Sequence, residues 1–337
     1  MSSFWKNKRV LITGGAGFIG SNLMRRLLDE GAIVRAVDNL ERGRIEWLKP
    51  MLASVEFKTC DLRDPAQVRA AVQDVEVVFH LASKVGGIKV YLDHAGTVLN
   101  QNCLMDQNVF AAVVEARTPS VFYASTSHVY PEDMQMSPDA PALREPDAYP
   151  PRPGLTYGWG KLLGEITLQA LAREHDWLRV SMARIVGAYG PNQDIDLATG
   201  SVIPVFCHRA IRWPEGAPFR IWGTGTETRS YCYVEDIVEG ILRSMVAQER
   251  DKVVGPFNLG AEGRVTIREI AERIVRISGK EIPLAFDPSA KTSIWGQAVD
   301  CSLARQLLDG WTPRHDFDTG LRLTYQHIEQ RLRTGKG

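Results

Sequence analysis

Short apolar runs alternate with longer segments of helical periodicity through the first half of the chain. The runs are 9–13, 33–37, 55–59, 75–81, 120–125 and 178–185, and the helical segments among them are 21–30, 64–72, 97–117 and 156–174. Strands that alternate with helices are typical of a parallel sheet covered by helices on both faces. The pattern therefore predicts an α/β fold with a doubly wound parallel sheet.

A glycine turn directly follows the first predicted strand. Gly14, Gly17 and Gly20 are spaced GxxGxxG in front of the helical segment 21–30. Glycines remove the side chains that would keep a pyrophosphate away from the first turn of a helix, where free N–H groups attract anions. The second strand ends in Asp38, whose carboxylate can accept both ribose hydroxyls of an adenosine and repels a 2′-phosphate. This unit predicts NAD in preference to NADP, and the alternative is a turn that only lets helix and strand pack closely.

The later part of the chain has shorter elements that are rich in Trp, Gly and Pro. We predict a Rossmann-like NAD-binding domain at 1–185, to which 225–260 return. A smaller C-terminal α/β domain at 186–224 and 261–335 would bind the substrate. The Pro-rich segment 131–153 is flanked by ordered patterns, so it is predicted to form a lid or rim and not a linker.

A phenol and an ammonium are placed on one face of a predicted helix, because Tyr157 and Lys161 are four residues apart. A nearby ammonium favours the phenolate and lowers the pKa of a tyrosine from about 10, which would make Tyr157 a general base for a hydroxyl. The spacing alone occurs by chance on many helices. Here, however, the strand before it ends at 125–127 in hydroxyl residues, and ligands bind where parallel strands end.

Together these motifs resemble the extended short-chain dehydrogenase/reductases, in the group of nucleotide-sugar epimerases and dehydratases. The resemblance covers nearly the whole chain, and the matching segments are 13–20, 38–40, 61–62, 80–83, 125–127, Tyr157 with Lys161, 189–191, 222–225 and 228–230. Segments 84–88 and 129–131 are similar to the GDP-mannose 3,5-epimerase and GDP-fucose synthase types, and 229–236 is similar to UDP-glucuronate decarboxylases.

The resemblance implies a tightly held NAD that takes a hydride from C4 of a nucleotide sugar and usually returns it. Tyr157 would take the C4 hydroxyl proton, Lys161 would hold the nicotinamide ribose, and Thr126 would hydrogen-bond the reacting oxygen. Asp61 would meet the adenine edge, and Arg229 would pair with a diphosphate oxygen. The implied cofactor-binding residues are Gly14, Gly17, Phe18, Ile19, Gly20, Asp38, Asn39, Leu40, Asp61, Leu62, Leu81, Ala82, Ser83, Tyr157 and Lys161. The implied substrate-binding residues are Lys84, Gly86, Thr126, His128, Tyr157 and Arg229.

His128, two residues after Thr126, bears on the subclass. Similar enzymes have Glu there when water or CO₂ is eliminated, Cys in the 3,5-epimerase and fucose-synthase types, and a small neutral residue in simple 4-epimerases. A histidine can move a proton at C3 or C5 of a 4-keto sugar, or it can be a hydrogen-bonding wall residue. We predict an NAD-dependent epimerase that acts through a 4-keto intermediate. The alternatives are a 4-dehydrogenase, dehydratase or decarboxylase that releases a keto sugar and, less favoured, a non-catalytic NAD-binding module.

Two positions depart from the family pattern. Gly187 stands where an Asn that contacts the diphosphate is common, and Gln297 stands where an Arg is usual. Because these two family contacts are missing, the sequence does not identify the nucleotide or the sugar of the substrate. Trp222 could stack on a base, although a Trp before a glycine turn is more often a core residue.

Composition excludes several classes of partner. Forty basic and forty acidic residues cancel in this chain of 337, so no global field favours nucleic acid or an anionic membrane. No segment approaches the length needed to span a bilayer, and the five scattered cysteines fit reduced thiols. We expect a cytoplasmic protein without a metal site. Asp194 and Asp196 lie in a polar loop that is typical of a solvated surface, and His80 is predicted to be a hydrogen-bonded core residue.

The two longest helical segments, 97–117 and 156–174, carry apolar stripes that are larger than a sheet contact requires. The stripes are Val98, Leu104, Met105 and Val109 on the first and Leu162, Leu163, Ile166 and Leu171 on the second. Similar enzymes pair these helices across a two-fold axis. The stripes therefore predict a homodimer.

Overall fold

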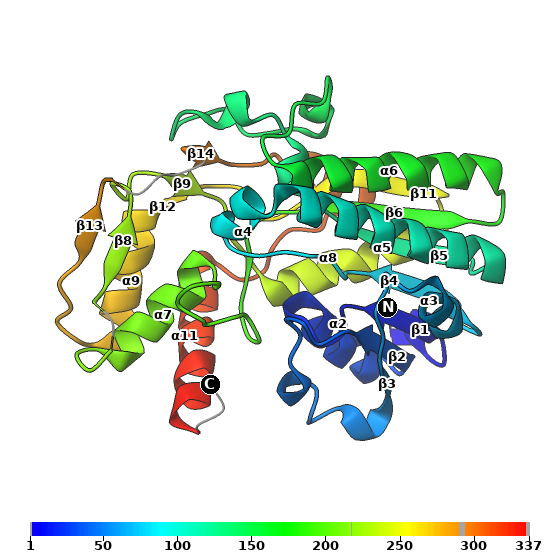
Figure 1. The fold of residues 1–337 in the computed structure, drawn as a ribbon, viewed down its shortest axis with the longest axis horizontal. Helices are drawn as coiled ribbons and strands as arrows, with labels where there is room; N and C mark the ends of the chain where they lie inside the picture. Colours follow the sequence, from blue (N-terminus) through cyan, green and yellow to red (C-terminus); the bar gives the residue numbers. More distant parts are fainter. Residues whose placement is uncertain (1, 217, 290–293, 335–337) are drawn as a thin grey trace.

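A seven-stranded sheet forms the centre of the computed structural model, which describes residues 2–216, 218–289 and 294–334 (Figure 1). Its strand order is β11-β6-β5-β4-β1-β2-β3, and every neighbouring pair is parallel. The strands are β1 (Arg9–Thr13), β2 (Ile33–Asp38), β3 (Val55–Thr59), β4 (Val77–His80), β5 (Ser120–Thr126), β6 (Arg179–Ile185) and β11 (Val253–Leu259). Because the chain runs from β1 out to β3 and then resumes at β4 on the other side of β1, the predicted doubly wound α/β fold is confirmed.

Helices cover both faces of this sheet. On one face lie α2 (Phe18–Asp29) and α8 (Val234–Ala247), and on the other lie α3 (Pro65–Val72), α5 (Ala95–Ala116) and α6 (Thr156–Glu174). Separate apolar clusters bury the two faces, with Leu23 and Ile237 in the first and Val68, Val109 and Leu168 in the second. The carboxyl ends of the strands therefore meet along one edge that the helices leave open.

A smaller part lies at one end of the molecule, on the left of Figure 1. Its helices α7 (Val202–Arg212), α9 (Ile267–Ser278) and α11 (Phe317–Arg333) pack around a third apolar cluster. Its short strands are β8 (Arg220–Trp222), β9 (Thr228–Arg229), β12 (Val265–Thr266), β13 (Ala285–Asp287) and β14 (Gly296–Gln297). The remaining elements are α1 (Ser2–Trp5), α4 (Ile88–Asp93), α10 (Ser302–Leu307) and the paired strands β7 (Ala188–Tyr189) and β10 (Cys232–Tyr233).

The predicted division into two domains stays a prediction, and its positions 1, 217, 290–293 and 335 lie outside the described residues. β11 takes residues 253–259 back into the large sheet, whereas β9 pairs with β12 and β14. The two ends of the Pro-rich segment meet where Pro131 bridges Pro153. The segment also contacts the smaller part, because the hydroxyl of Thr228 in β9 donates to the carbonyl of Pro138 at 2.6 Å.

Only part of the predicted apolar stripes is exposed. Val98, Met105, Val109 and Leu162 are buried, so these positions belong to the core. Leu104, Leu163 and Ile166 remain exposed, and Trp159 joins them on the surface of α5 and α6. No helix in the part of the chain that the structure describes is long and apolar enough to cross a membrane.

Candidate functional site

The glycine turn between β1 and α2 leaves no room for side chains. Gly14 has φ of +69°, and a Cβ there would lie 2.9 Å from backbone atoms of Ala82. A Cβ on Gly20 would lie 2.2 Å from the carbonyl oxygen of Gly14. The turn is therefore fixed as bare backbone at the N-terminal end of a 12-residue helix, which is a favourable place for a phosphate group.

A cavity of about 440 Å³ opens at this turn, along the carboxyl ends of the strands. The predicted site residues that line it are Gly14, Gly17, Phe18, Ile19, Gly20, Asp38, Asn39, Leu62, Leu81, Ala82, Ser83, Lys84, Gly86, Thr126 and Tyr157. The predicted residues that are not in its lining are Leu40, Asp61, His128, Lys161 and Arg229. The strands and the turn thus bring most of the predicted set together.

Asp38 is held in place at the end of β2. Its Oδ2 accepts the backbone N–H of Ala16 at 3.1 Å, and its Oδ1 accepts that of Leu40 at 2.8 Å. Burial nevertheless raises the pKa of Asp38. Leu40 itself has φ of +59° and is exposed, and its backbone N–H is the group that holds Asp38.

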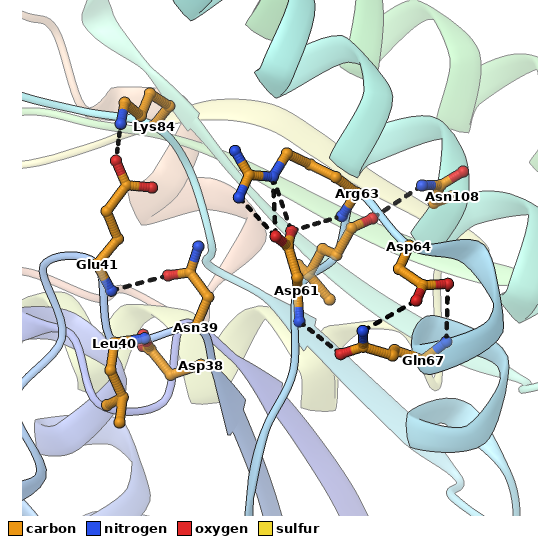
Figure 2. A network of polar contacts seen from close by, with 11 residues as sticks. Asp38, Asn39, Leu40, Glu41, Asp61, Arg63, Asp64, Gln67, Lys84 and Asn108 are labelled. Carbon is orange, nitrogen blue, oxygen red and sulfur yellow. Dashed lines mark hydrogen bonds and ion pairs between the residues drawn. The ribbon is translucent and has the colours of Figure 1, made fainter.

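The Asp61 carboxylate is engaged by a neighbouring arginine, as Figure 2 shows. The Nε of Arg63 donates to Oδ1 at 2.8 Å, and an Nη donates to Oδ2 at 2.5 Å. This pairing lowers the pKa of Asp61. Arg63, which the sequence analysis did not identify, lines the cavity, whereas Asp61, which was expected to meet the adenine edge, does not.

Two ion pairs join loops on opposite sides of the cavity. Lys84 pairs with Glu41 (Figure 2). Arg42 donates to the carbonyl of Val85 at 2.6 Å and to Oδ2 of Asp194 at 3.0 Å. These contacts join residues that are 43 and 152 positions apart, and no local pattern predicts such pairs. The interpretation of Asp194 as solvated surface is wrong, since it is paired at the cavity.

Tyr157 lies at the first turn of α6 and is 7% exposed. The side chains of Ser83 and Thr126 are the polar groups next to its hydroxyl, and both oppose the rise of its pKa. Its ring stacks on Tyr91 at a centroid distance of 5.1 Å and meets the edge of His128 at 5.8 Å. Burial raises the pKa of Tyr157, so the expected lowering is not a property of the chain alone.

Lys161 is 1% exposed, and its Nζ has no hydrogen-bond partner among the described residues. Its nearest carboxylate oxygen, Oδ1 of Asp106, is 3.9 Å away. Burial lowers the pKa of Lys161. An ammonium with unused donors, one helical turn from Tyr157 in α6, fits a ligand that brings hydroxyl groups, as the ribose of a dinucleotide does.

His128 follows Thr126 in a short turn, in which its backbone N–H donates to the Thr126 hydroxyl at 3.2 Å. Burial and the nearby charge of Arg229 lower the pKa of His128 to about 4, so it is neutral at pH 7. Arg229 donates to the carbonyls of Thr228 and Ile294 and lines a second cavity of about 450 Å³.

The two residues that depart from the family pattern, Gly187 and Gln297, are each in contact with a distant segment of the chain. Gly187 has φ of +54°, and a Cβ there would lie 1.9 Å from the carbonyl oxygen of Ser230, so no side chain reaches the site from this position. The Nε2 of Gln297 donates to Ser127 at 3.2 Å. Trp222 is 57% exposed, so its interpretation as a core residue is wrong. Within the residues described, no group of three or more His, Cys, Asp or Glu side chains is placed to hold a metal.

Comparison with known proteins gives consistent matches. A model described as the NAD dependent epimerase/dehydratase family matches residues 10–260. GDP-mannose 3,5-epimerase of Arabidopsis thaliana is 29% identical over 335 residues, which cover 99% of this chain and 86% of that protein. UDP-glucuronic acid decarboxylase 6 of the same plant is 30% identical over 334 residues, covering 98% and 91%. The structure of UDP-glucose 4-epimerase from Thermotoga maritima with UDP-glucose has a TM-score of 0.84 at 26% identity, covering 96% of this chain and 99% of that one.

Proposed function

Since the chain belongs to the NAD-dependent epimerase/dehydratase family, we propose that it is a nucleotide-sugar epimerase that acts through a transient 4-keto sugar. Its relatives and structural neighbours are nucleotide-sugar enzymes, and its cofactor is NAD. The observation that carries the proposal is that buried Tyr157 lines, together with Ser83 and Thr126, the cavity that begins with the glycine turn.

Bound NAD would supply the acceptor for a hydride from C4 of the sugar and the donor for its return. The residues that would hold it are the three turn glycines at the pyrophosphate, Asp38 at the adenosine ribose and Lys161 at the nicotinamide ribose. Tyr157 would take the proton of the C4 hydroxyl while Thr126 hydrogen-bonds the same oxygen. The positive charge of the oxidised nicotinamide ring would offset the desolvation that raises the pKa of Tyr157 in the chain alone.

A ketone at C4 makes the hydrogens on C3 and C5 acidic. His128 is neutral at pH 7, so its free ring nitrogen can accept a proton there, as a 3,5-epimerase requires. The alternative role, a wall residue beside a simple 4-epimerisation, needs no proton transfer by His128. The relative that is a GDP-mannose 3,5-epimerase supports the first role, and the structural neighbour that is a 4-epimerase supports the second.

The main rival reaction ends with release of a keto sugar or with decarboxylation, and the decarboxylase relative favours it. The pairs Glu41–Lys84 and Arg42–Asp194 cross the cavity and would retain the cofactor between the two hydride transfers, which supports a reaction that returns the hydride. A non-catalytic NAD-binding module has no use for the Tyr157 hydroxyl beside Thr126 at the cavity, because cofactor binding alone needs no proton transfer.

The test is a screen of GDP-, UDP-, dTDP-, CDP- and ADP-sugars by NMR in D₂O, with mass spectrometry of the denatured protein for bound NAD. We expect one sugar to be converted to its epimer. Deuterium at C3 or C5 of the product would support proton transfer by His128, and its absence would leave a 4-epimerisation. Accumulation of a keto sugar in place of an epimer would contradict the proposal.

We also propose that the enzyme is a homodimer through α5 and α6. Leu104, Trp159, Leu163 and Ile166 are each more than 40% exposed on these two adjoining helices. A patch of large apolar side chains on neighbouring helices is a feature of subunit interfaces.

A further inference from the structure

A buried acid lies behind the proposed catalytic pair, and the reaction scheme gives it no role. Asp106, on α5, is 2% exposed. Its Oδ1 accepts from Nε2 of His80 at 2.9 Å, and its Oδ2 accepts the hydroxyl of Tyr123 at 2.5 Å. Lys161 places Nζ 3.9 Å from Oδ1 of Asp106 and 4.5 Å from the ring centroid of Tyr123.

His80 does not neutralise this acid. Thr13 Oγ1 accepts the N–H groups of Leu81 and Ala82 at 3.2 and 3.3 Å, so its own proton is donated to Nδ1 of His80 at 2.8 Å. Nδ1 therefore carries no proton, and Nε2–H is the donor to Asp106. Both ring nitrogens are hydrogen-bonded, which confirms the prediction that His80 is a core residue, and the ring is neutral. Burial also lowers the pKa of His80.

The other titratable groups that face Lys161 offer it no free charge. Glu165, on α6, is bound by the guanidinium of Arg184 at 2.8 and 3.0 Å, with both side chains buried. Burial raises the pKa of the Cys103 thiol on α5 and of the Tyr123 phenol on β5, so both are neutral. Tyr157, on α6, is protonated in the chain alone for the same reason. Among the described residues, Asp106 is the carboxylate left to balance Lys161.

We propose that Asp106 is a positioning residue whose carboxylate is the counter-charge that keeps Lys161 an ammonium in the buried site, and that it thereby controls Tyr157 as a base. The proposal rests on the roles proposed above for Tyr157 and Lys161. A buried ammonium without a counter-charge loses its proton readily, because desolvation disfavours the charged form. The packing of α6 against β5 brings Lys161 close to Asp106. A Cβ on Gly164 would lie 2.1 Å from the hydroxyl oxygen of Tyr123, so α6 packs directly on that ring and brings Lys161 over it.

The first test compares pH profiles of kcat on the sugar found by the screen. Asp106→Asn removes the charge and keeps a hydrogen-bond acceptor. We expect kcat at pH 8 to fall about tenfold or more, and the alkaline limb to move down by about one pH unit or more, because Lys161 loses its proton as the pH rises through a lowered pKa. Tyr123→Phe is the matched control, since it removes one hydrogen bond from Asp106 and leaves the charge of Asp106. The alkaline limb of its pH profile is therefore expected to stay in place. An unmoved limb in Asp106→Asn overturns the proposal.

The second test does not depend on turnover. Thermal unfolding is measured for Asp106→Asn, Lys161→Met and the double variant. Each single change leaves one buried charge unpaired and should lower Tm, whereas the double variant removes both charges and should recover part of the loss. The same recovery is expected if Asp106→Asn alone does not fold. Losses of Tm that simply add would overturn the coupling. If the wild type converts no nucleotide sugar, the proposed function fails while this cycle still reports on Asp106 and Lys161.

Discussion

The hydroxyl of Tyr157 is the group whose removal should stop the chemistry with least change to the packing. Tyr157→Phe keeps the ring that stacks on Tyr91 and contacts His128. We expect kcat to fall about 10²- to 10⁴-fold, which is the usual contribution of a positioned general base, with bound NAD retained. Tyr149, which is 48% exposed, is the control, and Tyr149→Phe should behave as the wild type. Unchanged turnover by Tyr157→Phe would remove this residue from the mechanism.

A second prediction at this scale concerns His128 and the pH dependence of stability. Its folded-state pKa of about 4 lies below the ordinary value of about 6.5, so the unfolded chain takes up the proton first as the pH falls. The stability that depends on neutral His128 is therefore present above pH 6.5 and is lost between pH 6.5 and 4. Urea unfolding measures how much the free energy of unfolding decreases between pH 6.5 and 5. This decrease should be about 1.5 kcal/mol smaller in His128→Asn than in the wild type. The same change at the exposed His94 should leave the loss as in the wild type; equal losses in all three proteins would contradict the assignment.

At the scale of single residues, the sequence predicted those site residues whose positions follow from local spacing. Asp38 and Tyr157 were found because a turn, a strand end and a helical period place them in a known relation to a cavity. The direction of the Tyr157 pKa shift was wrong, because burial depends on how Tyr91 and the strand ends enclose the ring. The pairing of Arg42 with Asp194 joins residues 152 positions apart, and Asp106 was missed for the same reason: its partners come from β4, β5 and α6.

The glycine turn is the element on which cofactor binding depends. Gly20→Ala would place a Cβ 2.2 Å from the Gly14 carbonyl, so we expect a loss of about 2 kcal/mol or more in stability together with loss of co-purifying NAD. Gly96→Ala is the control, since Gly96 lies in α5 where a Cβ would have no atom within 4 Å, and alanine favours a helix by up to about 1 kcal/mol. Both are measured by thermal unfolding and by mass spectrometry. A Gly20→Ala protein with full NAD content would contradict the role of the turn.

The long helices and the strands of the large sheet were the elements that the sequence predicted well. α6 spans Thr156–Glu174 and β3 spans Val55–Thr59, as predicted. The strands of the smaller part are two or three residues long, too short for any periodicity, and α4 has only six residues. Among them, β9, β12 and β14 form because Thr228 and Arg229 pair with segments more than thirty positions away, which is a tertiary and not a local preference.

At the scale of the whole molecule, the exposed apolar face of α5 and α6 predicts the oligomeric state. Leu163→Glu combined with Ile166→Glu should give a monomer, because two charges would have to be desolvated at the interface. Sedimentation at micromolar concentration measures this. Leu323→Glu, on the exposed side of α11, should leave the dimer intact. A wild type that sediments only as a monomer would reject the dimer.

The proposed reaction comes down to one event, in which hydrogen leaves C4 of a sugar and comes back to the same carbon. In this proposal the cavity, the turn and the two ion pairs at the cavity would keep the cofactor in place between those two transfers. The most direct measurement uses the sugar identified by the screen, labelled with deuterium at C4 and converted in ordinary water, with the product examined by NMR. The account predicts an epimer that keeps the deuterium at C4. An epimer with protium at C4, or a product that has lost the label from that carbon, would contradict it.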